Sequence, residues 1–368
     1  MFSTMFFVGF VMVDFGRRVF LAGSCLNFIT PALAAESSLK ADADFIARLK
    51  GFNFSYFYKL GQESGFDLDD FYFISESGFS AARIPFDYRV FFRSLSPVVP
   101  DEKRFSQLDK LIDCAIQLRV HVSLCMHRAP GYCVNPPYEN RSLWRDHEPL
   151  DEFLAAWSYI AERYASVGCR NLSFNLLNEP KREVSEIDYL KVIYQGIDVI
   201  RAISPGRVIV LDGLVWGTEE INSSLLPDGV VQGARGYYPM HFTHHQASWV
   251  NEKYRNLNPT WPINLGAEVV GYDSLLYMFR KSWPSTIGNR KPVTVGEFGV
   301  FNKTPHDHTL NYMSDCLRIF DGFGWGWLLW NFRGPFGVVN SERQDVSYTK
   351  IGQYAVDMKM LHLLKSFL

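Results

Sequence analysis

From residue 51 onward, short apolar runs alternate with amphipathic stretches of helical length. The apolar runs are rich in β-branched and aromatic residues, so the alternation is typical of repeated βα units with parallel strands. Helices are predicted at 105–118 and 149–167, because apolar residues recur there with the 3.6-residue period of a helix. The predicted strands are 51–55, 81–88, 121–127, 171–179, 208–213, 230–238, 293–298 and 325–332.

Eight strands separated by helices favour one closed (β/α)8 TIM barrel. The chain has 368 residues, a length that single α/β barrels reach, and no Gly/Ser-rich or Pro-rich linker divides it. An open, doubly wound sheet is the alternative fold. That fold would need a GxGxxG phosphate loop after the first strand, where this chain reads Gly51-Phe52-Asn53-Phe54. We therefore expect a single barrel domain over residues 36–368.

The first 35 residues differ in composition from the rest of the chain. The pair Arg17-Arg18 is followed by a modest apolar stretch, and the small residues Ala32-Leu33-Ala34 precede Ala35-Glu36. This order of basic, apolar and small-residue regions is that of an export signal. The paired arginines resemble the twin-arginine signal of bacteria. Residues 1–35 are therefore predicted to be a signal peptide of a secreted or periplasmic protein, with no stable membrane insertion after cleavage.

Two other interpretations of this region remain open. Residues 1–13 are apolar and could belong to a membrane anchor, although this stretch is shorter than the ~20 residues that span a bilayer. We expect instead that translation starts at Met12. Cys25 could be lipidated, but residues 22–24 lack the large aliphatic residue that usually lies three places before such a cysteine.

The other five cysteines indicate neither a structural metal site nor a compact disulfide framework. They form no CxxC pair and have no histidine at zinc-finger spacing. Their odd number leaves at least one free thiol, and we expect a protein that uses no metal or other cofactor. These cysteines are Cys114, Cys125, Cys133, Cys169 and Cys316.

Composition narrows the classes of partner. Hydrophobic residues make up 47% of the chain and charged residues 21%, which suits a globular protein with a large core. The formal net charge is -2, and no run of lysine or arginine provides the positive surface that nucleic-acid binding requires. A neutral substrate fits better. Aromatic residues make up 15% of the chain, and exposed Trp and Tyr rings stack on sugar faces.

Several predicted strands end or are interrupted at a charged or polar side chain. In a barrel, the carboxyl ends of the strands converge on one mouth, where active sites are built. A single terminal carboxylate is more often a solvated helix cap, but several such residues together favour a site. These positions are Arg83, His127, Asn178-Glu179-Pro180, Glu297 and Trp330-Asn331.

Glu179 and Glu297 are the two carboxylates of this set. They are separated by about three βα units, which places them on strands four and seven, across the mouth. Two facing carboxylates suit glycoside cleavage, because one protonates the leaving oxygen while the other attacks the anomeric carbon. This chemistry needs one pKa held high and the other held low.

The neighbouring polar residues have roles that suit the same chemistry. Asn178 is placed to donate to a sugar 2-hydroxyl, and Arg83 and His127 would keep the nucleophile ionised, because a nearby cation or donor favours a charged carboxylate. Each has a structural alternative. Arg83 could form an ion pair under the barrel mouth, and His127 could be a packed core histidine.

These residues together resemble glycoside hydrolase family 5 of clan A, the retaining endoglucanase and mannanase family. The similarity extends from Gly51-Phe52-Asn53 to Trp330. The resemblance implies that Glu179 is the acid/base, that Glu297 is the nucleophile and that Asn178 contacts the 2-hydroxyl. It also implies that Tyr237 bonds the nucleophile and that Trp330 forms the floor of the subsite for the reacting sugar. The matching residues are Arg83, His127, Asn178-Glu179-Pro180, Tyr237, Gly296-Glu297-Phe298-Gly299 and Trp330.

One position departs from the family pattern. Family members usually carry His-x-Tyr on the sixth strand, whereas this chain reads Arg235-Gly236-Tyr237. The histidine normally backs the acid/base residue, so an arginine there would lower the pKa of that residue unless it points elsewhere. The departure also leaves Tyr238 as a competitor of Tyr237.

The segment 242–246 also resembles one in many relatives, and from it we expect His244 or His245 to reach the cleft. Together with His241 these histidines could suggest zinc. However, no carboxylate follows at a ligand spacing, which weighs against a metal site.

The resemblance implies an endo-β-1,4-glucanase, with mannan and mixed-linkage glucan as alternative substrates. No carbohydrate-binding module or Ser/Thr/Pro linker is present, which favours soluble or amorphous glucan. A transglycosylase would carry the same residues. A non-catalytic envelope protein would be expected to have lost a carboxylate. Predicted loops carry four tryptophans that would either stack on sugars or pack a loop onto the barrel, namely Trp144, Trp216, Trp249 and Trp261.

Overall fold

The computed structural model describes residues 31–61, 66–252, 259–284 and 291–368, with the side chains of α1 described from Ser38 onward. Eight parallel strands of this part form a closed barrel in the order β2-β1-β13-β12-β9-β8-β7-β5, which a β2–β5 pairing closes. The predicted (β/α)8 fold is therefore confirmed. The barrel strands are β1 (Lys50–Asn53), β2 (Ala81–Asp87), β5 (His121–Ala129), β7 (Leu172–Asn175), β8 (Ile209–Asp212), β9 (Val230–Gly236), β12 (Val293–Phe298) and β13 (Gly326–Leu329).

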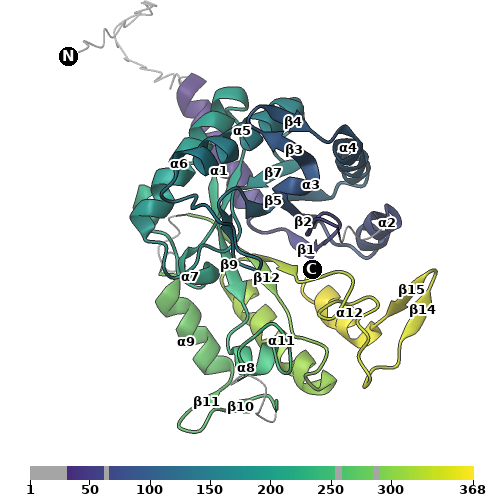
Figure 1. Ribbon diagram of the computed structural model, residues 1–368. Helices are drawn as coiled ribbons and strands as arrows, with labels where there is room; N and C mark the ends of the chain where they lie inside the picture. Colours follow the sequence, from purple (N-terminus) through teal and green to yellow (C-terminus); the bar gives the residue numbers. More distant parts are fainter. Residues whose placement is uncertain (1–30, 62–65, 253–258, 285–290) are drawn as a thin grey trace, which may run out of the picture.

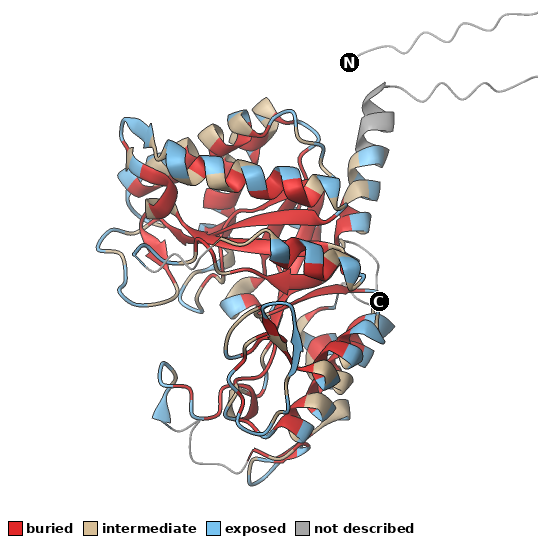
Figure 2. Cartoon of the chain, turned by 90° about the vertical axis from the view of Figure 1, so that its right-hand side faces the viewer, coloured by how far each residue is buried: buried red, intermediate tan, exposed pale blue. Residues whose placement is uncertain are grey.

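Helices surround the barrel, and their apolar faces cover the strands (Figures 1 and 2). The periodicity that predicted the helices at 105–118 and 149–167 corresponds to α4 and α5. The side chain of Asp101 caps α4 by accepting from the backbone N of Arg104. The longer helices are α2 (Asp69–Glu76), α4 (Glu102–Gln117), α5 (His147–Arg163), α6 (Glu186–Ile203), α9 (Tyr272–Ser282), α11 (His306–Gly322) and α12 (Met358–Lys365).

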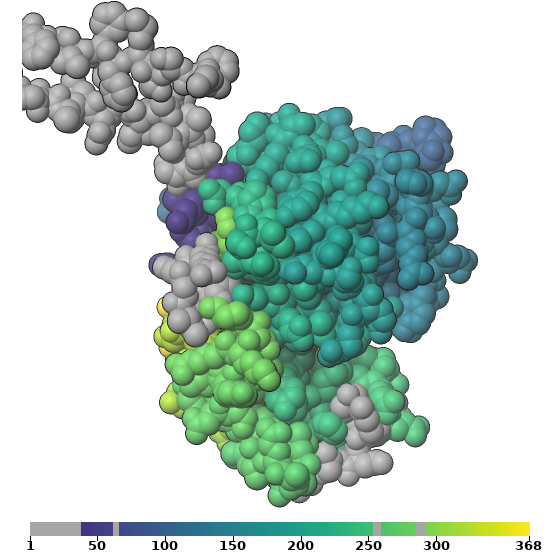
Figure 3. Space-filling model, turned by 90° about the vertical axis from the view of Figure 1, so that its left-hand side faces the viewer, coloured from purple at the N-terminus to yellow at the C-terminus, as the bar shows by residue number. Residues whose placement is uncertain are grey.

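Short helices and strands lie in the segments that connect the barrel strands and the longer helices. Figure 3 shows the segments after β9 in green, as a lobe below the teal segments that precede β9. The short helices are α3 (Tyr88–Phe91), α7 (Leu214–Gly217), η1 (Ser223–Leu225) and α8 (Met240–Thr243). The short strands are β3 (Phe92–Leu95), β4 (Val98–Pro100), β6 (Tyr132–Cys133), β10 (Ile263–Asn264), β11 (Val269–Val270), β14 (Thr349–Ile351) and β15 (Tyr354–Val356).

Helix α1 (Pro31–Ile46) lies at the base of the barrel. Ala43 and Ile46 of this helix pack with Val208, Val210 and Val231, which lie at the start of β8 and β9. Residues 1–30 of the predicted signal peptide lie outside the described residues, so the cleavage position stays a prediction. In the described ranges, no helix is both long and apolar enough to cross a bilayer.

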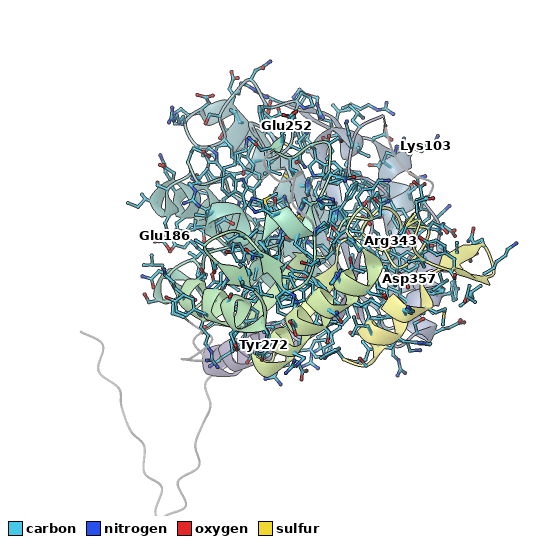
Figure 4. All side chains as sticks on the ribbon, turned by 90° about the horizontal axis from the view of Figure 1, so that it is seen from below. Lys103, Glu186, Glu252, Tyr272, Arg343 and Asp357 are labelled. Carbon is cyan, nitrogen blue, oxygen red and sulfur yellow. The ribbon has the colours of Figure 1, made fainter. Side chains whose placement is uncertain are left out.

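The C-terminal segment is hydrogen-bonded to the segment that follows β12. The buried Arg343 donates to the carbonyl oxygens of Thr304 at 2.7 Å and Val300 at 2.9 Å. Asp357 accepts from Nε2 of His306 at 2.6 Å. Arg343 and Asp357 are labelled in Figure 4. These contacts hold the chain beyond β13 against the carboxyl ends of the barrel strands.

Several predicted strands end earlier than the sequence pattern indicates, among them the eighth, since β13 ends at Leu329 and not at residue 332, and two others that carry residues of the site. The fourth was predicted to reach residue 179, but β7 ends at Asn175, and Glu179 has a backbone φ of +46° that an extended strand does not allow. The sixth, β9, ends at Gly236. In both cases the chain leaves the sheet just where the polar residues of the mouth begin.

Candidate active site

The backbone of Glu179 is fixed from two sides. Its N–H donates to Oδ2 of Asp212 at 3.0 Å, and its carbonyl oxygen accepts from the hydroxyl of Tyr132. The same hydroxyl accepts from the backbone N–H of Lys181 at 2.9 Å. Since few residues other than glycine adopt a positive φ, these bonds account for how Glu179 keeps this conformation. They direct its side chain into the barrel mouth.

Glu297 lies on β12 next to a local irregularity in strand pairing. Val295 pairs with Ala234 of β9, but the next partner of β9, Arg235, lies opposite Glu297. The extra residue, Gly296, forms a bulge, a feature that often redirects a side chain beside an active site. The bulge places the carboxylate of Glu297 beside Arg235.

The carboxylate of Glu297 is buried and has two hydrogen-bond donors. Its Oε1 accepts from Nη1 of Arg83 at 2.6 Å, and its Oε2 accepts from the hydroxyl of Tyr237 at 3.1 Å. The bond to Arg83 is an ion pair of short length, and together the two donors fix the orientation of the carboxyl group. The tyrosine that bonds Glu297 is thus Tyr237 and not Tyr238. Tyr238 is exposed, and its carbonyl oxygen accepts a hydrogen bond from the hydroxyl of Tyr312.

Arg83 is buried inside the barrel and contacts residues of five other strands or strand ends. Its guanidinium is thus an ion-pair partner of Glu297 and also a central support of the barrel interior. Besides Glu297, it donates to Asn175 Oδ1 at 3.0 Å, Asn53 Oδ1 at 2.9 Å, Asn178 Oδ1 at 2.8 Å and Cys125 Sγ at 3.0 Å.

Arg235 points directly at Glu179. Its Nε donates to Oε1 of Glu179 at 2.8 Å, and its Nη2 lies 3.4 Å from Oε1 of Glu297. Nη2 also donates to Oδ1 of Asn178 at 3.0 Å and to Oδ2 of Asp212. One guanidinium therefore contacts both predicted catalytic carboxylates.

The pKa of Glu179 is raised to about 7. Burial is the largest cause and the nearby charge of Glu297 is the second, whereas Arg235 acts in the opposite direction. Arg235 by itself lowers the pKa of Glu179, as the sequence predicted. Burial and the repulsion from Glu297 outweigh it.

Asn178 lies between the two arginines. Its Oδ1 accepts from both Arg83 and Arg235, so the amide orientation is fixed with Nδ2 as the free donor. Among the described residues, Nδ2 of Asn178 is buried without a hydrogen-bond partner. A buried donor without a partner is costly, so a substrate hydroxyl that accepts from Nδ2 would be stabilised.

His127 was expected to keep Glu297 ionised, but its contacts are with other residues. Its ring lies 4.6 Å from the ring of Tyr58 and is stacked at 6.0 Å on Trp330, and its Nε2 is 3.3 Å from Nδ2 of Asn135. Burial and, less strongly, the charges of the two interior arginines lower its pKa well below the usual value. A neutral imidazole without a described contact to Glu297 does not keep that carboxylate ionised. His127 instead supports the ring of Trp330.

His244 lies behind the partner of Glu297. Its ring meets the ring of Tyr237 edge-on at 5.1 Å, and its Nδ1 is 2.9 Å from Oγ1 of Thr243. Burial lowers the pKa of His244 to about 4. In the part of the chain that the structure describes, no group of three or more His, Cys, Asp or Glu side chains is arranged to hold a metal ion. All five described cysteines have free thiols.

The four tryptophans predicted in loops have different environments. Trp249 is 59% exposed and Trp216 is 37% exposed, so both present ring surface to solvent. Trp144 is partly buried against Tyr132 at 5.2 Å. Trp261 is buried, and its Nε1 donates to Asp315 at 2.9 Å, so the idea that it stacks on a sugar is wrong. An indole buried in this way packs the loop onto α11.

Three polar residues of the site were missed from the sequence. Asp212 ends β8 in the run Ile209-Val210-Leu211-Asp212, and a carboxylate after an apolar strand is the same signal that identified Glu297. Asn53 and Asn175 face the barrel interior within strands, where an amide among apolar residues indicates a buried polar network.

The family model described as "Cellulase (glycosyl hydrolase family 5)" matches residues 41–334. The chain belongs to glycosyl hydrolase family 5. The resemblance inferred from the sequence is therefore confirmed, and the protein is a glycosidase that acts on saccharide substrates.

Relatives and solved structures agree with this assignment. Endoglucanase C of Acetivibrio thermocellus is 23% identical over 300 residues, which cover 74% of this chain and 86% of that protein. A solved glycoside hydrolase is 35% identical, with a TM-score of 0.81 and coverage of 87% of this chain and 99% of its own. Endoglucanase Cel5A of Thermotoga maritima shares the fold, with 23% identity, a TM-score of 0.72 and coverage of 89% and 99%.

The raised pKa of Glu179 predicts a pH-dependent loss of stability. Between pH 4.5, the ordinary pKa, and about 7 the folded state keeps a proton that the unfolded state has released, so the free energy of unfolding falls as pH rises. We expect Glu179→Gln to raise the melting temperature relative to wild type at pH 8 and to change it least near pH 4.5. The exposed Glu183→Gln is the control for the loss of a carboxyl group, measured at the same pH values. A constant difference for Glu179→Gln would contradict the raised pKa.

Proposed function

We propose that this protein is a retaining endo-β-1,4-glucanase in which Glu179 is the general acid/base and Glu297 the nucleophile. The observation that carries the proposal is the contrast between two carboxyl groups that share one guanidinium, that of Arg235. Glu297 forms an ion pair with Arg83 and accepts a hydrogen bond from Tyr237, which hold its carboxyl group in one orientation. Glu179 has a pKa raised to about 7 and so carries a proton in mildly acidic solution.

In the first step, Glu179 donates its proton to the glycosidic oxygen while an oxygen of Glu297 attacks the anomeric carbon. The glycosidic bond breaks, the leaving sugar departs as an alcohol, and a glycosyl ester of Glu297 forms. In the second step, Glu179, now ionised, removes a proton from water as the water attacks the anomeric carbon. The ester bond breaks, Glu297 is released as a carboxylate, and the sugar keeps its β configuration.

The retaining pathway is favoured by the closeness of the two groups. Retaining enzymes hold their carboxyl groups about 5 to 5.5 Å apart, whereas inverting enzymes leave a wider gap for a water molecule. Here Arg235 lies within 2.8 Å of an oxygen of Glu179 and 3.4 Å of an oxygen of Glu297. A single guanidinium that contacts both groups holds the two carboxyl groups near each other, which supports the retaining arrangement.

β-1,4-Glucan is proposed as the substrate because several curated relatives are endoglucanases, including those of Acetivibrio thermocellus and Fibrobacter succinogenes. Mannan and mixed-linkage glucan are the other candidates, and one solved structure of Thermotoga maritima Cel5A is in complex with mannotriose. A transglycosylase would share the first step and use a sugar hydroxyl in the second. A non-catalytic envelope protein is disfavoured, since both carboxylates are present with their partners.

The roles of the carboxylates are tested with dinitrophenyl β-cellobioside, whose leaving group departs without an acid. We expect Glu297→Gln to lose at least about a thousand-fold in kcat on β-glucan. Glu179→Ala should lose activity on β-glucan but release dinitrophenol, and azide should accelerate it by attacking the glycosyl ester of Glu297. The product is then a β-glycosyl azide, identified by NMR.

The exposed Glu183→Gln serves as the matched control and should keep wild-type rates on both substrates. An α-glycosyl azide from Glu179→Ala would show inversion and overturn the double displacement. Full activity of Glu297→Gln would overturn its role as nucleophile. Relative rates of wild-type enzyme on carboxymethyl cellulose, lichenan and glucomannan distinguish the three candidate substrates, and transfer products in place of reducing ends would identify a transglycosylase.

Trp249 is proposed as a stacking platform on the side of Glu297. Its ring is held edge-on by Phe301 at 5.0 Å and lies near His244, the ring that supports Tyr237. We expect Trp249→Ala to raise KM for oligosaccharides by about ten-fold, the effect of losing one to two kcal/mol of aromatic stacking, with a smaller change in kcat. Tyr277→Ala on α9, also an exposed aromatic ring, should leave KM unchanged. An unchanged KM for Trp249→Ala would assign the ring to loop packing.

Export of the mature protein is proposed from the sequence of residues 1–35, with the paired arginines and the small residues 32–34 as its support. The expected result is that protein from the periplasm or medium of a bacterial host begins at or near residue 35 when its N-terminus is sequenced. Replacing Arg17-Arg18 by two lysines should retain the protein inside the cell. An exported form that still begins with Met1 would contradict the signal.

A further inference from the structure

We propose that Asp212 and Arg235 form a buried ion pair that positions the general acid/base and sets its charge environment. The inference rests on the proposed role of Glu179 as acid/base. It concerns two residues that are argued to act through Glu179 and not on the sugar, so they are positioning residues. Arg235 occupies the place of a family histidine, and Asp212 lies on the neighbouring strand β8.

The contacts of Asp212 link the side chain and the backbone of the acid/base. Its Oδ2 accepts from Nη2 of Arg235 and also from the backbone N–H of Glu179 at 3.0 Å. Arg235 in turn donates from Nε to the carboxyl of Glu179 at 2.8 Å. The three residues thus form a closed ring of hydrogen bonds that fixes Glu179 at both ends.

Three glycines make room for this pair, which is an observation independent of the hydrogen bonds. A Cβ atom on Gly296 would lie 2.7 Å from Nη1 of Arg235, and one on Gly217 would lie 2.7 Å from its Cγ. A Cβ on Gly233 would lie 2.6 Å from Oδ1 of Asp212. Glycines from β9, β12 and α7 therefore surround a space that the ion pair occupies.

The pair is almost completely removed from water. Asp212 is 0% exposed and Arg235 is 3% exposed. Oδ1 of Asp212 is occupied as well, since it accepts from Nδ2 of Asn175 at 3.2 Å. Removing one member of such a pair would leave a buried charge without its partner, which proteins tolerate poorly. The arrangement therefore fixes one orientation of the guanidinium.

Charge balance explains how the pair acts on Glu179. Arg83 and Arg235 contribute two positive charges, and Asp212 and Glu297 contribute two negative charges, so the interior is neutral only while Glu179 keeps its proton. Arg235 lowers the pKa of Glu179, and Asp212 raises it. The two members of the pair thus act on the same proton in opposite directions.

The other groups around Glu179 do not add charge. Burial raises the pKa of Tyr132 and of Tyr237, so both phenols stay protonated, and the buried His127 is neutral. The charged and titratable groups that surround Glu179 are Arg235 on β9, Tyr237 just after β9, Glu297 on β12, Asp212 on β8, Tyr132 on β6, Arg83 on β2, His127 on β5 and Tyr58 after β1.

The test compares pH profiles of kcat/KM for Arg235→Gln and Asp212→Asn. Loss of the arginine charge should move the alkaline limb to higher pH, and loss of the aspartate charge should move it to lower pH, each by about one unit or more. Both variants should lose about 10- to 100-fold in kcat on cellotetraose, which needs a positioned acid. Both should lose much less on dinitrophenyl β-cellobioside, whose leaving group needs no acid.

Arg235→Lys separates charge from geometry. A lysine keeps the positive charge but not the fork of donors, so the alkaline limb should stay near that of wild type while kcat on cellotetraose still falls. The matched controls are Arg170→Gln and Asp42→Asn, which break a 2.7 Å arginine–aspartate bond at the other end of the barrel and should change neither limb nor rate. Melting curves establish that each variant is folded before its profile is interpreted.

The outcomes distinguish this inference from the function on which it rests. Opposite shifts of the two limbs support the positioning pair. Alkaline limbs that stay at the wild-type pH, or that shift in the same direction, would overturn the positioning pair. If Glu179→Gln is nevertheless inactive on cellotetraose, the acid/base role of Glu179 is unaffected. Full activity of Glu179→Gln on cellotetraose would instead overturn the proposed function itself. If Asp212→Asn does not fold, Arg235→Lys and Arg235→Gln decide the question alone.

Discussion

The barrel interior of this protein is organised by buried charge, and the positions of the other site residues depend on it. Two arginines from β2 and β9 meet the buried carboxylates of β8 and β12 and the partly exposed carboxyl group of Glu179 after β7. Buried ions are tolerated only when each has partners, so several strands around the barrel interior must bring polar side chains to one level of the barrel. This requirement accounts for the amides of Asn53, Asn175 and Asn178, each of which accepts from Arg83.

The same requirement shapes the backbone. The bulge at Gly296 and the positive φ of Glu179 both occur where a strand must turn a carboxylate inward. Gly217 and Gly233 lack the Cβ atoms that would collide with Arg235 and Asp212. Irregular backbone near the mouth is therefore a consequence of fitting large charged groups inside a barrel of regular strands. At the base of the barrel, apolar residues of α1 pack against apolar residues of β8 and β9.

The sequence alone predicted the fold well, because the period of each strand and helix is a local property. It also singled out Glu179, Glu297, Tyr237 and Arg83, since each belongs to a recognisable motif, and the structure brings these side chains together at the barrel mouth. It missed Asp212, because an Asp-Gly pair after a strand is also an ordinary turn signal. The environments of His127 and Trp261 could not be predicted, since their burial depends on rings and carboxylates from distant loops. The orientation of Arg235 depends on glycines of three segments that meet only in the fold.

An arginine in place of a histidine needs different partners from the surrounding residues. A histidine at this position could itself lose its proton near neutral pH, so it need not bring a permanent charge into the barrel. A guanidinium does not lose its proton in proteins, so when buried it needs an anion as its partner. Asp212 is that anion, and it is spatially adjacent because β8 pairs with β9. An arginine at residue 235 is therefore compatible with acid/base chemistry only together with a carboxylate on the next strand. Because Asp212 is the ion-pair partner of Arg235, Glu179 remains the group that exchanges its proton.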